Sequence, residues 1–342
     1  MATTLVIRLS SLGDVAILIP VLYSVARKNS DDRFVLITKK PLYPLFVNKP
    51  DNLTVFPVHT KDKHKGFIGL LKGIPEINAV IMGLQVKPAM TEKIVKIADL
   101  HDVIRSGILD FYFRMKGAEI ALIDKGRKEK RALVQQNHKK LAPLKTSIKR
   151  YQEVFEKLGY DASVDFTSLF AGKDKKEGTR IGIAPFAKHR GKIYPPELME
   201  EVVRRLNERP DTKIFLFGGK EESDLLEYWM EKYASVESVA GQLSFHDELF
   251  LMNSLDVMLS MDSANMHLAS LVNTPVVSIW GATHPYAGFY GFNQNPDNAV
   301  QVDLVCRPCS TFGNKPCLRG DYACLKMISS EMIINQINKI LK

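Results

Sequence analysis

The chain has 342 residues, of which 45% are hydrophobic, and a single core stops growing at roughly 250 to 300 residues. No stretch approaches the ~20 apolar residues that span a bilayer, and the start lacks the basic flank and cleavage site of a signal peptide. We therefore expect a cytoplasmic protein of two domains. Its 47 basic and 38 acidic residues leave a net charge of +9, which favours polyanionic partners such as nucleic acid, anionic lipid headgroups or phosphorylated glycans.

Strand-like and helix-like runs alternate along the first half, which is typical of an α/β fold with a parallel sheet covered on both faces. The first expected helix covers residues 14–28 and contains Pro20, which should kink it or loosen its first turns. The expected strands cover residues 4–8, 34–38, 53–58, 79–82, 94–98 and 119–124.

The same alternation recurs in the second half, after a charged, glycine-containing stretch at residues 172–179 that we expect to be a linker. Helices are expected to begin near residues 195, 221, 246 and 263, and an amphipathic final helix covers residues 330–341. The expected strands cover residues 180–184, 213–217, 236–240, 256–260 and 276–280. The chain thus predicts two similar Rossmann-like αβα domains that face each other across a cleft.

The expected strand 256–260 ends at Asp262, where a helix begins, and such a junction is where α/β proteins bind phosphate. The small residues Ser263 and Ala264 would let a diphosphate approach free backbone N–H groups at the positive end of the helix dipole. Asp262 and His267 would supply side-chain contacts. This favours a nucleotide or nucleotide-sugar site; the alternative is an ordinary helix cap with a buried histidine.

The first strand also runs directly into a helix, through Gly13 and Asp14. Gly13 permits a tight turn, and the helix dipole keeps the Asp14 carboxylate ionised at the carboxyl end of the strand. Asp14 could therefore act as a general base, and the alternative is again a helix cap. The G-x-G-x-x-G pattern is absent after the first strand, which disfavours a nicotinamide or flavin cofactor.

Three segments resemble glycosyltransferase family 9, which contains the ADP-heptose:lipopolysaccharide heptosyltransferases; they cover residues 7–15, 262–269 and 281–285. The resemblance implies a GT-B fold with an N-terminal acceptor-binding domain (1–171), a C-terminal nucleotide-sugar domain (172–328) and a terminal helix (329–342) packing back toward the first domain. It also implies transfer of heptose from ADP-heptose to a lipopolysaccharide core, with inversion and without a catalytic cofactor or metal. The alternative is another GT-B enzyme with a different nucleotide sugar, either a transferase or a 2-epimerase.

The resemblance assigns roles to particular residues. Asp14 matches the base that deprotonates the acceptor hydroxyl, and Asp262 matches the aspartate that holds the hydroxyls of the donor sugar. Ser263 and Ala264 match the residues whose backbone N–H groups hold the diphosphate, where the family more often has Thr-Gly. His267 matches a histidine that contacts phosphate or sugar.

Two further donor contacts follow from the resemblance. Lys192 resembles the lysine that pairs with a donor phosphate, although Lys188 and Arg190 compete for this role. Glu221 or Glu222 resembles the acidic residue that accepts the ribose hydroxyls, with the register uncertain by one residue. The alternative for all of them is solvated charge at the start of a helix.

Basic residues cluster at residues 59–72 and 126–140. They fit a phosphorylated lipid A and inner-core acceptor, or another lipid-linked acidic glycan, which would place the protein peripherally on the inner face of the inner membrane. The alternative is two solvated loops. We do not expect nucleic-acid binding, because neither stretch interleaves aromatic residues among its basic ones.

All the cysteines of the chain fall in one segment: Cys306, Cys309, Cys317 and Cys324. A Cys-x-x-Cys pair followed by two more thiols is consistent with a structural zinc or iron–sulfur site, and a cytoplasmic location argues against permanent disulfides. The alternative is a cluster of free or disulfide-capable thiols. Two non-enzymatic functions also stay open at this point, a polyanion-binding module and a zinc-stabilised interaction protein.

Overall fold

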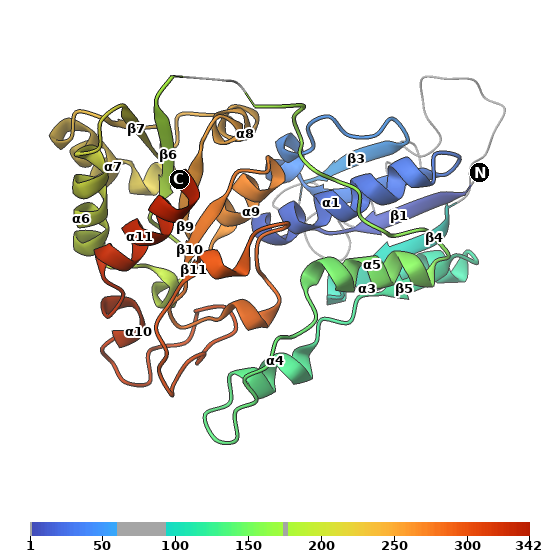
Figure 1. Ribbon diagram of the computed structural model, residues 1–342. Coiled ribbons are helices and arrows are strands. Elements are labelled where there is room, and N and C mark those ends of the chain that lie inside the picture. Colours follow the sequence, from blue (N-terminus) through green and yellow to red (C-terminus); the bar gives the residue numbers. More distant parts are fainter. Residues whose placement is uncertain (1, 60–93, 174–176) are drawn as a thin grey trace. The chain divides into compact units, whose positions relative to one another are not determined.

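The computed structural model describes residues 2–59, 94–173 and 177–342. It divides into two compact units (Figure 1): Met1–Lys125 with Ser147–Phe166, and Gly126–Thr146 with Thr167–Lys342. The expected strand at residues 79–82 and nearly all of the basic stretch 59–72 lie outside the described residues. Each unit contains a parallel sheet, and the predicted α/β fold is confirmed.

The first unit is built on five parallel strands in the order β3-β2-β1-β4-β5. The central strand, β1, is buried along its whole length, as expected of a parallel strand covered on both faces. Because the strand order reverses between β1 and β4, the loops that follow these two strands diverge and leave room for a ligand. The strands are β1 (Thr3–Ile7), β2 (Arg33–Lys39), β3 (Leu53–Val58), β4 (Ile94–Asp99) and β5 (Glu119–Leu122).

Helices cover this sheet on both faces because right-handed crossovers on either side of the reversal place their helices on opposite faces. Helix α1 (Leu12–Lys28) follows β1, continues through Pro20 and packs against α5 (Ser147–Lys157). Helix α3 (Ile104–Met115) follows β4, and its Leu109 and Phe113 join the core beneath β1, β2 and β4. A short 3-10 helix, η1 (Lys40–Leu45), follows β2.

The second unit contains six parallel strands in the order β11-β10-β9-β6-β7-β8. Its order reverses between β6 and β9. The strands are β6 (Thr179–Ala184), β7 (Thr212–Leu216), β8 (Val236–Ser238), β9 (Val257–Met261), β10 (Val276–Ile279) and β11 (Ala299–Val300).

The helices of the second unit lie on both faces of its sheet (Figure 1). Helices α8 (Phe245–Asn253) and α9 (Ala264–Leu271) contact each other, and α11 (Ser330–Leu341) contacts α6 (Pro196–Asn207). The inner face of α11 supplies Ile333, Ile334 and Ile337 to the core, as its amphipathic pattern predicts. The remaining elements are α4 (Arg127–Leu133), α7 (Ser223–Lys232), α10 (Ala323–Lys326) and the 3-10 helices η2 (Arg190–Lys192), η3 (Lys220–Glu222), η4 (Pro285–Ala287) and η5 (Pro296–Asn298).

The division into units differs from the expected domain boundaries at two segments, residues 126–146 and 167–171. Residues 126–146, which contain α4 and the second basic stretch, belong to the second unit by their contacts. The Lys139 ammonium donates to the carbonyl oxygens of Val305 (3.1 Å) and Arg307 (2.8 Å). Helix α11 also packs within the second unit, so its expected return toward the first unit stays a prediction. Within the described ranges, no helix combines the length and apolarity needed to cross a bilayer.

Candidate active site

The candidate site of the first unit lies where β1 ends and α1 begins. Ser11 is the N-cap of α1, and Asp14 is the third residue of the helix. The Oδ2 atom of Asp14 accepts hydrogen bonds from the Ser11 backbone N–H (3.1 Å) and the Ser11 hydroxyl (2.7 Å). It also forms an ion pair with the Arg8 guanidinium at 2.7 Å. Asp14 therefore helps to cap the start of α1, and it does so through Oδ2 alone.

The other oxygen of Asp14 decides whether chemistry is possible there. No hydrogen bond to Oδ1 occurs among the described residues, and the side chain keeps 29% of its surface exposed. Burial by itself would raise the pKa of Asp14, but the Arg8 charge and the Ser11 hydrogen bonds outweigh it and hold this pKa below its usual value. Asp14 is thus an ionised carboxylate with one oxygen free to accept a proton, and Arg8 limits its basicity.

A second carboxylate, that of Asp99, lies at the end of the neighbouring strand β4. The Oδ1 atom of Asp99, the last residue of β4, accepts the backbone N–H groups of His101 (2.7 Å) and Asp102 (2.9 Å). Its Oδ2 is buried without a hydrogen-bond partner among the described residues, and the Asp110 carboxyl of α3 lies close enough to feel the Asp99 charge. Burial, together with the Asp99 charge, raises the pKa of Asp110 to about 8. The backbone hydrogen bonds to Oδ1 of Asp99 fix the loop after β4.

This loop holds His101 near Arg8 and Asp14. Burial and the positive charges of Arg8 and Lys125 lower the pKa of His101 to about 4, so its imidazole is neutral at physiological pH. Its Nδ1 is buried and has no hydrogen-bond partner in the described part of the chain. Asp99, His101 and Asp110 were not predicted as site residues, although Asp99 has the same strand-end position that singled out Asp14.

The candidate site of the second unit lies at the carboxyl edge of its six-stranded sheet. Lys192 follows β6, Glu221 and Glu222 follow β7, Asp262 follows β9, and Thr283 follows β10. Parallel strands bring these loops to one edge, on either side of the order reversal between β6 and β9. The predicted donor residues of this unit thus come from one strand edge.

An ion pair forms the centre of the candidate site in the second unit. The Lys192 ammonium lies 2.8 Å from Oδ2 of Asp262, and both side chains are mostly buried. The Thr283 hydroxyl donates to the same oxygen at 2.7 Å. Lys188 is exposed, and Arg190 donates to the Ile193 carbonyl and lies over the Tyr322 ring. Of these three basic candidates, Lys192 is the one that contacts Asp262.

The start of α9 is arranged as an anion site requires. Ser263 is the N-cap, and its side chain makes no capping hydrogen bond. Ser263 and Ala264 are partly exposed, whereas Met266 and His267 are buried in the same helix. The first N–H groups of α9 therefore lie at the protein surface, where a diphosphate can approach the positive end of the helix dipole.

The two glutamates after β7 differ in their contacts. Oε2 of Glu222 accepts the Gly219 backbone N–H at 2.7 Å and closes its own turn. Glu221 is exposed beside it. Both stay candidates for the ribose contact, and Glu222 retains one oxygen for this purpose.

A loop far along the chain supports Lys192. The Gly191 N–H donates to the Gly313 carbonyl at 3.3 Å, and the Ala282 N–H donates to the Gly191 carbonyl at 2.8 Å. Gly313 has a φ of +73°, and a Cβ atom there would lie 2.6 Å from Cγ of Lys192. The buried Arg307 guanidinium binds the loop further, through the carbonyl oxygens of Trp280, Gly281, Thr283 and Val302.

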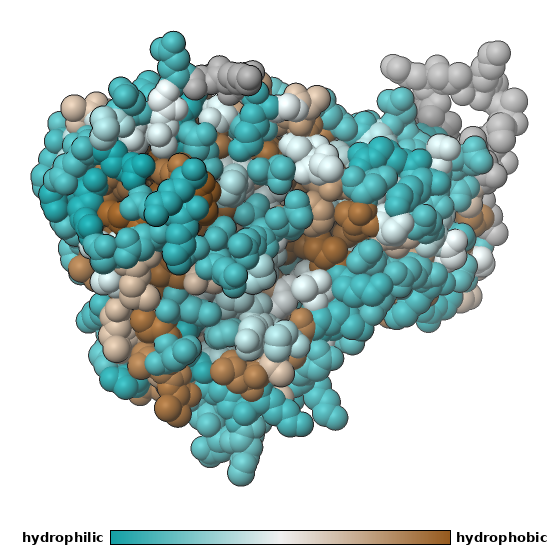
Figure 2. Space-filling view, in the orientation of Figure 1, coloured by the Kyte–Doolittle hydropathy of each residue, from teal (hydrophilic) through white to brown (hydrophobic). Residues whose placement is uncertain are grey.

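The four cysteines lie on this same supporting segment, and all have free thiols. Burial and the neighbouring Cys306 and Cys317 raise the pKa of Cys309, and burial raises that of Cys324 to about 11. Within the described residues, however, no three His, Cys, Asp or Glu side chains are close enough to hold a metal ion. Figure 2 shows apolar surface over the loops beside α10, where the exposed side chains are Val305, Phe312, Leu318 and Met327.

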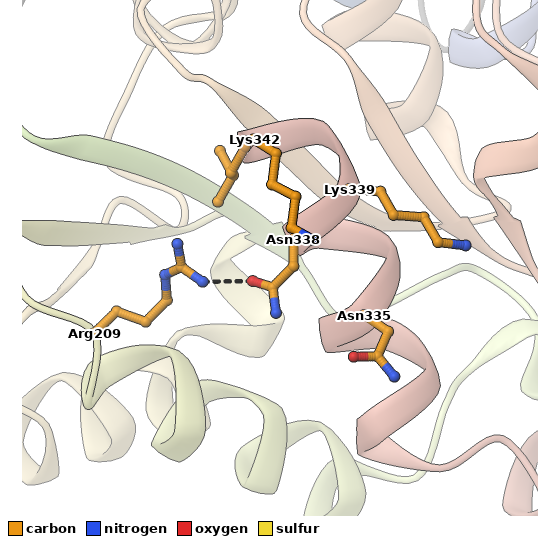
Figure 3. Close-up of a pocket in the computed structure, with 6 residues that line it drawn as sticks. Arg209, Asn335, Asn338, Lys339 and Lys342 are labelled. Atoms are coloured by element: carbon orange, nitrogen blue, oxygen red, sulfur yellow. Dashed lines mark hydrogen bonds between the residues drawn. The ribbon is translucent and has the colours of Figure 1, made fainter.

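A surface hollow elsewhere in the second unit is unrelated to this edge. It lies between the end of α11 and the turn after α6 (Figure 3), where the Arg209 guanidinium donates to the Asn338 amide oxygen. Because Arg209 precedes β7, the hollow lies at the amino edge of the sheet. Its lining residues are Arg209, Asn335, Asn338, Lys339, Leu341 and Lys342, which include no carboxylate, hydroxyl, thiol or imidazole side chain.

Comparison with known proteins decides the family. A family model described as glycosyltransferase family 9 (heptosyltransferase) matches residues 97–315, more than half of the chain. The chain belongs to glycosyltransferase family 9. It is a glycosyltransferase of the heptosyltransferase type. No curated protein sequence matches it significantly.

Solved structures of family 9 enzymes share the fold. A family 9 glycosyltransferase from Veillonella parvula is similar with a TM-score of 0.73 and 18% identity, over 99% of this chain and 97% of that one. The E. coli heptosyltransferase WaaC, solved with ADP-2-deoxy-2-fluoro heptose, has a TM-score of 0.67 and 18% identity over 98% and 99%. E. coli ADP-heptose lps heptosyltransferase II has a TM-score of 0.67 and 14% identity over 100% and 98%. The GT-B fold is thereby confirmed for this family 9 chain.

Proposed function

We propose that the protein transfers heptose from ADP-heptose to a lipopolysaccharide core acceptor, with inversion and without a catalytic metal. The observation that supports this most directly is the Lys192–Asp262–Thr283 cluster at the start of α9, since it combines a cation for a phosphate with a carboxylate for sugar hydroxyls. The relative solved with ADP-2-deoxy-2-fluoro heptose shares the fold of this unit and supports the choice of donor.

In the proposed reaction, Oδ1 of Asp14 takes the proton from the acceptor hydroxyl while the hydroxyl oxygen attacks the anomeric carbon of the donor. The bond from that carbon to the diphosphate breaks on the opposite face, and ADP leaves. The Lys192 ammonium and the first N–H groups of α9, at Ser263 and Ala264, stabilise the negative charge that develops on the diphosphate. A positive side chain and a helix dipole thus stabilise the charge of the departing diphosphate, as a metal ion does in other transferases.

The acceptor is proposed to be a phosphorylated, lipid-linked glycan, which would place the enzyme on the inner face of the inner membrane. The net charge of +9 supports this. So do the exposed basic residues around α4, where Arg127, Lys128, Arg131 and Lys140 lie on the surface.

The test compares Asp14→Asn with the wild type. It follows ADP release from ADP-heptose in the presence of lipid A that bears the inner-core sugars preceding the first heptose. Asparagine can still accept the Ser11 N–H and cap α1, so the fold should persist, whereas kcat should fall about 10²- to 10⁴-fold with the base removed. Ser11→Ala is the matched control, since it weakens the cap and leaves the base. Undiminished turnover of Asp14→Asn would refute the assignment.

The alternative is a GT-B enzyme that uses another nucleotide sugar. Thermal shifts with ADP-heptose, UDP-sugars and GDP-sugars separate the two, because a ligand that binds only the native state raises the melting temperature by mass action. Omitting added Mg²⁺ and Mn²⁺ should leave the transfer rate unchanged, and NMR of the product should show inverted anomeric configuration. A larger shift with a UDP- or GDP-sugar would favour the alternative.

We also propose a structural zinc ion at Cys306, Cys309, Cys317 and Cys324. The proposal is supported by the donor set, four thiols on one segment near enough to affect one another's pKa values. The thiols would have to close around the ion, since zinc–sulfur bonds are about 2.3 Å long. Metal analysis of the purified protein should find one zinc per chain, lost in Cys309→Ser. Protein that lacks stoichiometric metal would contradict it.

A further inference from the structure

Helix α3 has two apolar faces. Leu109 and Phe113 point into the core of the first unit, and Ser106 and Asp110 are buried beside them. On the outside, Ile104, Phe111 and Met115 are 89%, 68% and 73% exposed, and Ile108 is partly exposed. At about 100° per residue, these four outer side chains fall within an arc of roughly 60°. They form a continuous stripe, which we call the outer stripe of α3.

Basic side chains border the outer stripe on both sides. Arg105 and Arg114 are exposed and lie about 90° from its centre, one on each side. Lys116 follows at the C-terminal end of the helix and is also exposed. The acidic residue of α3 is Asp110, which is buried. The outer surface of the helix therefore offers hydrocarbon flanked by positive charge.

Single exposed apolar residues are common on soluble proteins, but a continuous stripe with polar borders marks an interaction surface. Apolar side chains flanked by arginine and lysine are typical of helices that lie in the plane of a membrane surface. There the apolar stripe enters the boundary of the acyl chains, and the basic side chains meet anionic headgroups.

A second copy of the chain fits this surface less well. A two-fold interface through the outer stripe would bring Arg105, Arg114 and Lys116 of both copies together without an exposed carboxylate of α3 to neutralise them. Like charges at an interface disfavour association. An anionic bilayer satisfies both the stripe and its borders.

We propose that the outer stripe of α3 is the surface through which this protein lies on an anionic lipid bilayer. Ile104, Phe111 and Met115 enter the boundary of the acyl chains, and Arg105 and Arg114 contact lipid phosphates. The inference deepens the proposed function, since a lipid-linked acceptor would be met at this surface, and it is measurable without donor or acceptor. Helix α3 lies beside β5 in the first unit (Figure 1), the sheet whose β1 leads to Asp14.

The test is sedimentation of the full chain with vesicles of phosphatidylglycerol and phosphatidylethanolamine, compared with vesicles of phosphatidylcholine. The wild type should bind the anionic vesicles and not the neutral ones. Phe111→Asp should weaken binding about tenfold or more, because it places a charge in the stripe. Arg105→Gln with Arg114→Gln should weaken binding roughly fivefold for each charge removed at low salt. Leu318→Asp is the matched control, since Leu318 is 66% exposed in the second unit.

Two results would overturn the inference: wild type that stays in solution with anionic vesicles, or Phe111→Asp that binds them as the wild type does. If Phe111→Asp instead turns a dimer into a monomer in light scattering and vesicles are not bound, the stripe is an interface between copies. Turnover on a water-soluble core oligosaccharide separates this inference from the proposed function. Phe111→Asp should keep wild-type turnover there, whereas an inactive wild type that still binds vesicles would refute the function alone.

Discussion

Lys192 and Asp262 form an ion pair of 2.8 Å although seven elements separate them in the sequence: α6, β7, η3, α7, β8, α8 and β9. Each was assigned to a different part of the donor, the lysine to a phosphate and the aspartate to the sugar. Because the two side chains contact each other, donor binding must share or replace this pair. It also gives the two residues opposite expected effects on the binding of ADP alone.

Lys192→Gln should weaken ADP binding and lower kcat about 10²- to 10³-fold, because it removes the charge that stabilises the departing diphosphate. Asp262→Asn should keep or strengthen ADP binding, since Lys192 is no longer neutralised, and should still lower the transfer rate. Calorimetric titration with ADP and turnover with ADP-heptose measure the two effects. Lys326→Gln, at an exposed position of α10, is the control. Equal losses of ADP affinity in both variants would show that the pair is purely structural.

Arg8→Gln should move the acid limb of the pH–rate profile to higher pH. In the wild type, the Arg8 charge holds the pKa of Asp14 below its usual value, so Asp14 stays ionised into acid solution. Without that charge, burial raises the pKa, and protonation of the base begins nearer neutrality. The profile of kcat/KM between pH 4 and 8 measures this.

The control for Arg8→Gln is Arg27→Gln, which breaks an exposed ion pair with Asp165 in the same unit and should leave the profile unchanged. If Arg8→Gln lowers the rate equally at every pH, Arg8 acts through the loop after β4, where it donates to the Leu100 carbonyl, and not through the basicity of Asp14.

The strand-to-helix junctions were predictable from sequence because local signals mark them. A buried apolar strand followed by Gly13-Asp14, or by Asp262-Ser263, is visible in any short window, and the structure places both pairs at strand ends beside a reversal of strand order. The terminal helix was predicted to within a residue because its apolar positions recur at helical spacing.

Other features had no local signal. Helix α3 was not predicted, because apolar residues on both of its faces obscure the helical period. Thr283 and Gly313 reach Lys192 and Asp262 through contacts between separate loops, which spacing does not encode. The approach of the Asp99 and Asp110 carboxyls likewise depends on how α3 packs against β4.

Gly313→Ala should lower the transfer rate through Lys192. The new Cβ would lie 2.6 Å from Cγ of Lys192, so the lysine must move away from Asp262, and a displacement of about 1 Å can cost 10²-fold. The kcat and the affinity for ADP should both fall.

Gly320→Ala is a matched control for Gly313→Ala. Its φ of +78° is close to the +73° of Gly313, so the backbone strain is similar, but a Cβ there meets nothing within 4 Å. Both variants should lose comparable stability, and Gly313→Ala alone should lose activity. Equal activity of the two variants would show that Gly313 does not position Lys192.

Asp110→Asn should make the stability of the protein less dependent on pH between about pH 4 and about pH 8. The pKa of Asp110 is raised to about 8 by burial and by the neighbouring Asp99 carboxylate, whereas in the unfolded chain it returns to about 3.9. The folded state therefore binds the extra proton, and its stability falls as the pH rises from about 4 to about 8. An asparagine amide does not titrate, so the variant lacks this loss.

Melting temperatures from pH 6.5 to 9 test the Asp110 prediction, because His101, with a pKa of about 4, stays neutral in the folded protein there. At the alkaline end, the melting temperature of the wild type should lie about 2 to 4 °C below that of Asp110→Asn, as expected for a difference of ~1 kcal/mol in the free energy of unfolding. Exposed Asp51→Asn is the control and should follow the wild type. Parallel curves for wild type and Asp110→Asn would mean that Asp110 is ionised across this range, and the loop after β4 would then have to be held by Asp99 alone.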